Sequence, residues 1–200
     1  MNERITFRKN EHLRTVNPRW RGNPSVGKFF NRQHRWRPGV ESVLKWRFSP
    51  NPQRKEKRQV KWNPRIHYLR SLDAAVGNCL IWLGHNSFFL QLGGKRFMID
   101  PVYGSIPFVK RRSEFPASPS IFRDIDYLLI SHDHFDHLDK PSVAKLVAGN
   151  PRMKLFCGIG TGRLIQGWFP GLQVIEAAWY QQYADGDLRL TFLPAQHWSK

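Results

Sequence analysis

Hydrophobic and polar positions follow different patterns before and after about residue 70. In the later part, short runs rich in β-branched and aromatic residues are separated by glycine, proline and polar residues, a pattern typical of strands joined by turns. The runs predict strands at 78–83, 87–92, 95–100, 126–131, 153–158, 172–176 and 187–193, and helices at 141–148 and 161–168. We expect an antiparallel meander with a tight turn at Gly93-Gly94, followed by strands that alternate with helices, as in layered α/β folds.

The first 70 residues form a basic arm ahead of a domain at 71–200. The arm holds 19 Lys and Arg against 4 Asp and Glu, a net charge of +15, whereas residues 71–200 carry +2. Its prolines argue against one long helix, and its aromatics argue against full disorder: Trp20, Phe29, Phe30, Trp36, Trp46, Phe48 and Trp62. We expect an irregular arm, wrapped around the domain with its cations outward, that contacts anionic phospholipid. RNA, bound through phosphate contacts and stacking, is a less favoured partner. The alternative without a partner is a partly disordered, solvated arm whose aromatics pack on the domain.

No apolar stretch approaches the roughly 20 residues that a membrane-spanning helix needs. The first residues lack the apolar core of a signal peptide. Cys79 and Cys157 lie in apolar, strand-like runs and are expected to be reduced thiols. A cytoplasmic protein is therefore expected, with the arm able to hold it at the inner face of the membrane.

A cluster of metal-binding residue types follows the apolar run 127–130. It consists of His132, His134, Asp136 and His137 in the pattern HxHxDH. Alternation along an extended chain points the first two histidines to the same side. Imidazole and carboxylate suit zinc and its neighbours, so two nitrogens can bind one ion, and a carboxylate beside a third imidazole can bind a second. Hydrolysis near neutral pH is the expected use; a solvated, histidine-rich turn is the alternative.

Three further residues stand at predicted element ends. Asp100, before Pro101, either fixes the tautomer of a metal-binding histidine or caps a turn. Asp139 either caps the helix announced by Pro141 or braces the metal loop. His197 follows a strand-like run, where loops present functional side chains, although a lone histidine beside a tryptophan is more often structural.

Four motifs in order resemble the N-acylphosphatidylethanolamine-hydrolysing phospholipase D branch of the metallo-β-lactamase superfamily. They are WLGHNS at 82–87, FMIDPV at 97–102, SHDHFDHLD at 131–139 and PAQHWS at 194–199. The resemblance covers roughly residues 60–200 and implies an αββα sandwich of which the chain holds the N-terminal half. It implies that His132, His134 and His197 bind one zinc ion and that Asp136 and His137 bind a second. It also implies that Asp100 supports the metal loop and that a histidine is usual at His85, where the residues themselves suggest no role beyond a turn.

The family site is completed by a bridging aspartate and a last histidine from the second half of the domain, which have no counterpart here. We therefore expect a C-terminally incomplete domain. Its uncovered sheet surface is expected to associate with a second copy of the chain or with a complementing C-terminal half. The resemblance implies a phospholipase D-type phosphodiesterase acting on N-acylphosphatidylethanolamine-like phospholipids, with Asp136 binding a metal and orienting a metal-bound hydroxide. The alternatives are a nuclease, a sugar-phosphate lactonase, or a catalytically silent zinc-binding fragment.

Two weaker candidate phosphate sites remain. The segment 103–123 contains Lys110, Arg111 and Arg112, and a solvated loop is favoured over a phosphate contact. The glycine-rich turn at 158–162 precedes a predicted helix and could hold a phosphate at the helix N-terminus. A plain strand-to-helix connection is the favoured interpretation there.

Overall fold

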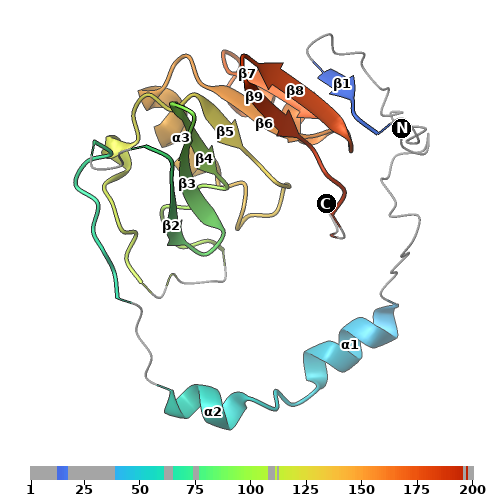
Figure 1. The fold of residues 1–200 in the computed structure, drawn as a ribbon. Coiled ribbons are helices and arrows are strands. Elements are labelled where there is room, and N and C mark those ends of the chain that lie inside the picture. The colour runs from blue at the N-terminus through green and yellow to red at the C-terminus, as the bar shows by residue number, and fades with distance from the viewer. Residues whose placement is uncertain are drawn as a thin grey trace.

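The computed structural model describes residues 13–17, 39–60, 65–73, 77–107, 111, 113–195 and 197. Two β-sheets lie face to face, and helices cover the outer face of the larger sheet (Figure 1). The larger sheet has six strands in the order β2-β3-β4-β5-β6-β7. These are β2 (Cys79–Gly84), β3 (Ser87–Leu92), β4 (Lys95–Ile99), β5 (Tyr127–Leu129), β6 (Lys154–Gly158) and β7 (Gln173–Ala177).

The direction of the strands changes at β4. β2, β3 and β4 are antiparallel, and Gly93 and Gly94, both at positive φ, make the tight turn predicted between β3 and β4. From β4 to β7 the pairs are parallel, so each later strand is reached by a crossover. The crossovers contain the 3-10 helix η1 (Pro119–Ile121), then α3 (Lys140–Gly149), then α4 (Thr161–Trp168). Every predicted strand and helix is present, with bounds within two residues, and the α/β prediction is confirmed.

A second sheet has three antiparallel strands in the order β1-β8-β9. They are β1 (Leu13–Thr15), β8 (Gln181–Asp185) and β9 (Leu188–Thr191). The sequence pattern did not predict β8, because Tyr183 is its only buried residue and the polar residues around it resemble a loop. β1 comes from the basic arm and pairs with β8 through Leu13 opposite Tyr183.

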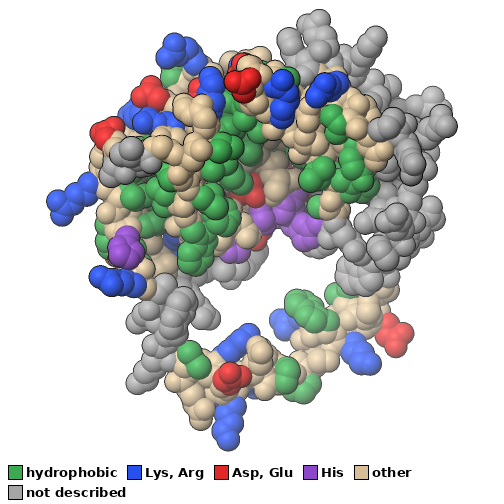
Figure 2. Space-filling view, in the orientation of Figure 1, with side chains coloured by type: hydrophobic (Ala, Val, Ile, Leu, Met, Phe, Trp, Pro, Cys, Tyr) green, Lys and Arg blue, Asp and Glu red, His purple; other side chains and the backbone are tan. Residues whose placement is uncertain are grey.

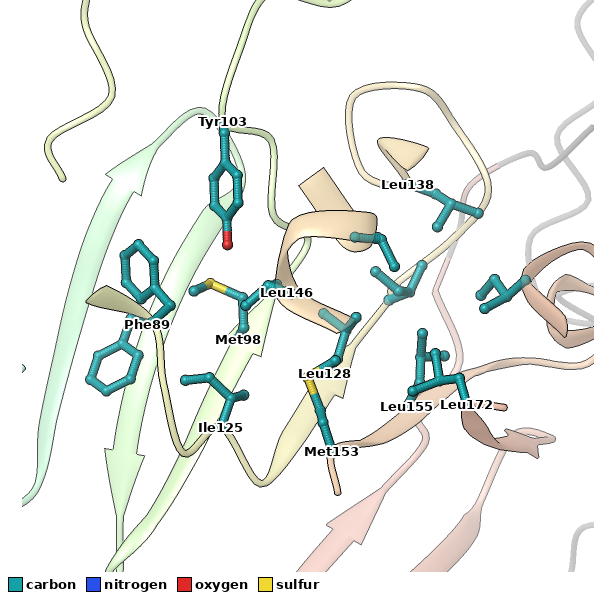
Figure 3. Packing of buried hydrophobic residues seen from close by; sticks show 14 of the residues in the cluster. Phe89, Met98, Tyr103, Ile125, Leu128, Leu138, Leu146, Met153, Leu155 and Leu172 are labelled. Carbon is teal, nitrogen blue, oxygen red and sulfur yellow. The ribbon is translucent and has the colours of Figure 1, made fainter. Parts of the chain in front are cut away.

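The parallel strands are buried on both faces. In β4, Phe97 packs toward the second sheet whereas its neighbour Met98 packs toward the helices, and β6 repeats the alternation with Phe156 and Leu155. Figure 3 shows Leu146 of α3 lying over the helix side of the sheet, close to Met98 and Leu128. This layering of helix on sheet on sheet holds the carboxyl ends of β4 and β5 in fixed positions.

The first candidate phosphate site of the sequence, the segment 103–123, is the place of Arg111. Arg111 does not lie in a solvated loop: its guanidinium donates to the carbonyl oxygens of Leu83 (2.5 Å), Val102 (3.1 Å) and Ser113 (2.9 Å). Gly84, at φ 96°, leaves the room for it, because a Cβ there would overlap the guanidinium. Lys110 and Arg112 lie outside the described residues.

The glycine-rich turn is filled from within the protein. The carboxylate of Glu176 on β7 accepts from the backbone N–H groups of Gly160 (2.9 Å) and Gly162 (2.6 Å) at the start of α4. An internal carboxylate thus takes the place that an anion could occupy at this helix N-terminus. The structure supports the interpretation of this turn as a strand-to-helix connection.

Within the arm that the sequence predicts to be irregular, the structure describes β1 and two short helices, α1 (Val40–Phe48) and α2 (Arg54–Gln59). Pro50 and Pro52 separate the helices, and neither helix buries a residue. Among the described residues, no helix is both long and apolar enough to cross a membrane. Cys79 and Cys157 are free thiols, as predicted, and burial raises the pKa of Cys157.

The Arg111 contacts predict a measurable contribution to stability. Replacing Arg111 with Met removes three charge-assisted hydrogen bonds and leaves carbonyls without donors, so the free energy of unfolding should fall by about 2 kcal/mol. Urea unfolding followed by circular dichroism measures the change. Arg54→Met, at an exposed position on α2, is the matched control and should change it by less than about 0.5 kcal/mol. Equal stability of the two variants would contradict the structural role of Arg111.

Candidate metal centre

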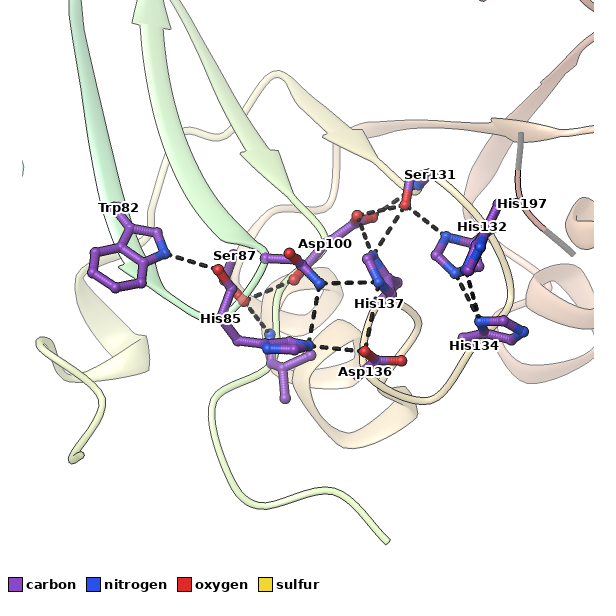
Figure 4. A network of polar contacts seen from close by, with 12 residues as sticks. Trp82, His85, Ser87, Asp100, Ser131, His132, His134, Asp136, His137 and His197 are labelled. Carbon is purple, nitrogen blue, oxygen red and sulfur yellow. Dashed lines mark hydrogen bonds and ion pairs between the residues drawn. The ribbon is translucent and has the colours of Figure 1, made fainter. Parts of the chain in front are cut away.

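Histidine and aspartate side chains gather at one edge of the larger sheet (Figures 2 and 4). Asp100 directly follows β4, and the loop 131–139 follows the parallel strand β5, so both begin at the same edge. β3 runs antiparallel to β4, which brings the turn before it, His85-Asn86, to that edge as well. His197 follows β9 and reaches the same place from the second sheet.

Three imidazoles form the first cluster, which we call the three-histidine cluster: His132, His134 and His197. His134 Nδ1 lies 2.9 Å from His132 Nε2 and 3.2 Å from His197 Nε2. Burial, followed by the neighbouring imidazoles, lowers the pKa of His132 to about 4, and burial and His197 lower the pKa of His134. Both rings are therefore neutral at pH 7, the state in which imidazole binds a metal ion.

The second cluster, called here the aspartate cluster, combines His85, Asp136 and His137. Asp136 Oδ2 lies 2.8 Å from His85 Nε2 and 3.6 Å from His137 Nε2. Burial alone would lower the pKa of His137, but its hydrogen bond to Asp100 and the charges of Asp100 and Asp136 raise the pKa overall. Burial raises the pKa of Asp136, but the hydrogen bond from His85 and the nearby imidazoles lower it overall. The cluster thus favours positive charge beside an ionised carboxylate.

Asp100 links the two clusters. Its carboxylate is buried and accepts from the Ser131 N–H (2.8 Å), the Ser131 hydroxyl (2.6 Å) and His137 Nδ1 (2.8 Å). The oxygen of that hydroxyl also lies 3.0 Å from His132 Nδ1, whose N–H it can accept. A proton held at Nδ1 of each ring leaves Nε2 with a lone pair facing its own cluster. Asp100 therefore orients one ring directly and the other through Ser131.

Sequence reasoning missed Ser131 and Asn86. Ser131 immediately precedes His132 in the motif, and this adjacency was the available signal. The Asn86 side-chain nitrogen lies 3.1 Å from both His85 Nε2 and His137 Nε2. Asn86 stands beside His85 in a turn, where an asparagine is commonly explained by backbone conformation alone.

Asp139, like Asp100, belongs to neither cluster, but unlike Asp100 it caps a helix. Its carboxylate accepts from the Ser142 N–H (3.1 Å) and the Ser142 hydroxyl (2.5 Å). Asp139 therefore caps α3, which is the first of the two roles expected from the sequence. The capped helix begins directly after the loop and fixes the loop's end. Asp139 acts on the site through that backbone anchor, and the structure gives it no bond to a clustered histidine.

The donor atoms fit metal ions. Zinc–nitrogen bonds of about 2.0–2.1 Å in a tetrahedral site place two ligand nitrogens about 3.3 Å apart. The nitrogens of the three-histidine cluster lie 2.9 Å and 3.2 Å apart, close to that spacing. In the aspartate cluster a cation is the natural neighbour of a carboxylate oxygen and two imidazole nitrogens. The ring centroids of His132 and His137 lie 4.0 Å apart, so the two positions adjoin each other.

A cavity of about 560 Å³ opens beside the three-histidine cluster. It lies between the two sheets and is largely apolar, with Leu129, Phe156, Tyr183 and Leu190 among its walls. His132 and His197 form part of its lining. An apolar ligand in this cavity would contact the metal-binding side chains.

Comparisons with known proteins give the following similarities. A family model described as a beta-lactamase superfamily domain matches residues 95–200. An uncharacterized protein of Mycobacterium tuberculosis is 30% identical over 125 residues, which cover 59% of this chain and 33% of that protein. The N-acyl-phosphatidylethanolamine-hydrolyzing phospholipase D 1 of Caenorhabditis elegans is 31% identical over 130 residues, which cover 58% of this chain and 36% of the enzyme.

The chain spans about a third of the length of these two curated relatives. Among solved structures, Igni18, a metallo hydrolase from Ignicoccus hospitalis KIN4/I, aligns with a TM-score of 0.45 at 23% identity. The alignment covers 60% of this chain and 49% of that structure.

The Asp100 contacts predict two different losses of metal affinity. Asp100→Asn should weaken zinc binding at both clusters by about 10–100-fold, because both rings lose their orientation. Ser131→Ala should weaken mainly the three-histidine cluster, because His137 loses a contact of 3.2 Å to the hydroxyl but keeps its shorter hydrogen bond to Asp100. Competition titration against a chromophoric chelator measures both affinities. Asp124→Asn is the matched control, because Asp124 is also an aspartate at positive φ but its side chain is 82% exposed. Full zinc affinity in Asp100→Asn would refute the linking role.

Proposed function

Because the chain belongs to the metallo-β-lactamase superfamily, we propose that it provides the metal-binding part of a phosphodiesterase that hydrolyses N-acylphosphatidylethanolamine-like phospholipids. The observation that carries the proposal is the pair of adjoining donor clusters, one of three imidazoles and one containing a carboxylate. Adjoining ions about 3.5–4 Å apart are typical of enzymes that cleave phosphate esters. The ring centroids of His132 and His137, one from each cluster, lie 4.0 Å apart, so the two clusters are direct neighbours.

Each protein group has a proposed task. His132, His134 and His197 hold one ion, and Asp136 and His137 hold the other. Asp136 is also proposed to orient the attacking water. When bound, the ions make water nucleophilic near neutral pH and stabilise charge on the phosphoryl oxygens.

Zinc is the proposed metal. Nitrogen donors predominate in the three-histidine cluster, and neutral imidazole suits zinc, although imidazole also binds iron and copper. The carboxylate of the aspartate cluster widens the choice of metal there. Metal content measured on the purified chain therefore belongs in the first experiment.

Two observations support a phospholipid as the substrate. The Caenorhabditis elegans relative is named for hydrolysis of N-acyl-phosphatidylethanolamine, and the match to it covers 58% of this chain. The cavity between the sheets offers apolar walls directly beside His132 and His197. A lipid chain lying there would place its headgroup near the clusters.

The basic arm is proposed to bring the protein to an anionic membrane. α1 exposes Val40, Trp46 and Phe48, each by 77–78% of its surface, and α2 carries four cations in six residues (Figure 2). Exposed aromatic and aliphatic groups next to Lys and Arg suit the headgroup level of a bilayer. A homo-oligomer or a complementing second polypeptide stays a prediction.

The activity prediction has one readout for metal and one for turnover. The zinc-loaded chain should hydrolyse N-acylphosphatidylethanolamine in mixed micelles, and His134→Ala should reduce turnover by more than about 100-fold because a ligand is lost. His67→Ala, an exposed histidine outside both clusters, should keep full activity. Liquid chromatography with mass detection measures the product, and elemental analysis measures bound zinc.

Other outcomes favour the alternatives. Cleavage of RNA or of a sugar-phosphate lactone, with the phospholipid left intact, would make the chain a nuclease or a lactonase. Two bound ions without turnover of any of these substrates would identify a catalytically silent metal-binding fragment.

The membrane prediction is tested with vesicles. The chain should co-sediment with phosphatidylserine-containing vesicles more strongly than with pure phosphatidylcholine, and Lys57→Gln should weaken binding roughly fivefold, since one cation contributes about 1 kcal/mol. Lys145→Gln, exposed on α3, is the control and should bind as the unmodified chain does. Tight RNA binding that falls steeply with salt, together with no vesicle binding, would contradict the proposal.

A further inference from the structure

We propose that His85 is the third protein ligand of the metal position in the aspartate cluster, together with Asp136 and His137. The inference rests on the proposed two-metal function and extends it. The family resemblance leaves this histidine without a role, and on sequence grounds it is only part of a glycine-flanked turn. The geometry points to a coordinating role.

The donor atoms of His85 and its neighbours converge. His85 Nε2, Asp136 Oδ2 and one His137 nitrogen lie within 4.8 Å of one another, as the three-histidine cluster does for its own donors. His85 Nε2 lies 2.8 Å from Asp136 Oδ2, and His137 Nε2 lies 3.6 Å from the same oxygen. Among the described residues, His85 brings the number of protein donors in the aspartate cluster to three, the number in the neighbouring cluster.

Asn86 shows that the two imidazole nitrogens face one point. Its side-chain nitrogen lies 3.1 Å from His85 Nε2 and 3.1 Å from His137 Nε2 (Figure 4). An amide N–H can donate to an imidazole nitrogen only in the tautomer in which that nitrogen has a lone pair, which is also the tautomer that binds a metal ion. In this tautomer both rings direct a lone pair at one small region beside a carboxylate, and a cation there would satisfy all three acceptors.

The backbone of His85 has an unfavourable conformation, which its neighbours stabilise. His85 has φ 51°, in the left-handed region that favours glycine, and Gly84 before it has φ 96°. The Trp82 indole donates to the His85 carbonyl (2.8 Å), and Arg111 holds the carbonyl of Leu83. The turn is thus fixed from the β2 side in a conformation that directs the imidazole to Asp136.

A positioning role is the structural alternative. In that case His85 Nε2 carries a proton and donates to Asp136, so that it orients the carboxylate but cannot bind an ion. As a ligand, His85 instead carries its proton on Nδ1 and binds through Nε2. The two roles therefore differ in the protonated nitrogen of the metal-loaded protein, which nuclear magnetic resonance detects directly.

The experiment uses the full chain loaded with Zn²⁺, with Co²⁺ as the spectroscopic probe. His85→Gly and His85→Asn are the test variants, because glycine and asparagine both tolerate positive φ, and thermal unfolding verifies that they fold. His67→Asn is the matched control, an exposed histidine in neither cluster. Chelator competition gives the two affinities, and long-range proton–nitrogen correlation spectra give the state of each imidazole.

The inference predicts that the unmodified chain binds two ions. Both His85 variants should lose more than about 100-fold in affinity for the second ion, beyond the 10–100-fold typical of a lost hydrogen-bond partner, and keep the first within about twofold. The second Co²⁺ absorption band should change in the variants, and His85 Nε2 should show a metal-bound nitrogen shift in the unmodified protein.

Three outcomes would overturn the inference, and they differ in what else they overturn. If His85 Nε2 carries the proton in the zinc-loaded chain, or if both variants bind the second ion normally, His85 is not a ligand and the two-metal function stands. If the unmodified chain binds fewer than two ions, the two-metal function fails and the inference fails with it.

Discussion

The buried carboxylate of Asp100 is the interaction on which the organisation of the site depends. Its side chain accepts three hydrogen bonds from Ser131 and His137, while its backbone N–H donates to the Leu129 carbonyl and its own carbonyl accepts from Ser87. One residue therefore joins β3, β4 and the segment after β5. Hydrogen bonds to a buried charge contribute more than neutral ones and leave a large penalty when broken, so this junction fixes both backbone and rings.

The sheet topology makes such a junction possible. The change from antiparallel to parallel pairing at β4 brings the turn before β3, the end of β4 and the end of β5 to one edge. The parallel strands are buried by α3 and α4 on one face and by the second sheet on the other. Loops that leave such rigid strand ends can hold polar side chains in close register, as functional loops on rigid scaffolds generally do.

The local patterns of the sequence were sufficient for the strands of the larger sheet, for α3 and α4, and for the gathering of His132, His134, Asp136 and His137. These features depend on near neighbours in the chain or on a family resemblance. Strand β8 was missed because its burial comes from the opposing sheet. Arg111 was misjudged because two of its three acceptors, Leu83 and Val102, lie in other segments of the chain. Ser131 and Asn86 gain their roles from groups that folding brings close, Asp100 at 2.6 Å and His137 at 3.1 Å.

The contact between Arg111 and the Leu83 carbonyl connects a surface loop to the turn that carries His85. Gly84 provides the space for the guanidinium, so this contact requires both the arginine and the glycine. A change of sequence around residue 111 is therefore expected to move this turn while every metal-binding side chain stays the same. The position of His85 thus depends on a contact made by a residue far from it along the chain.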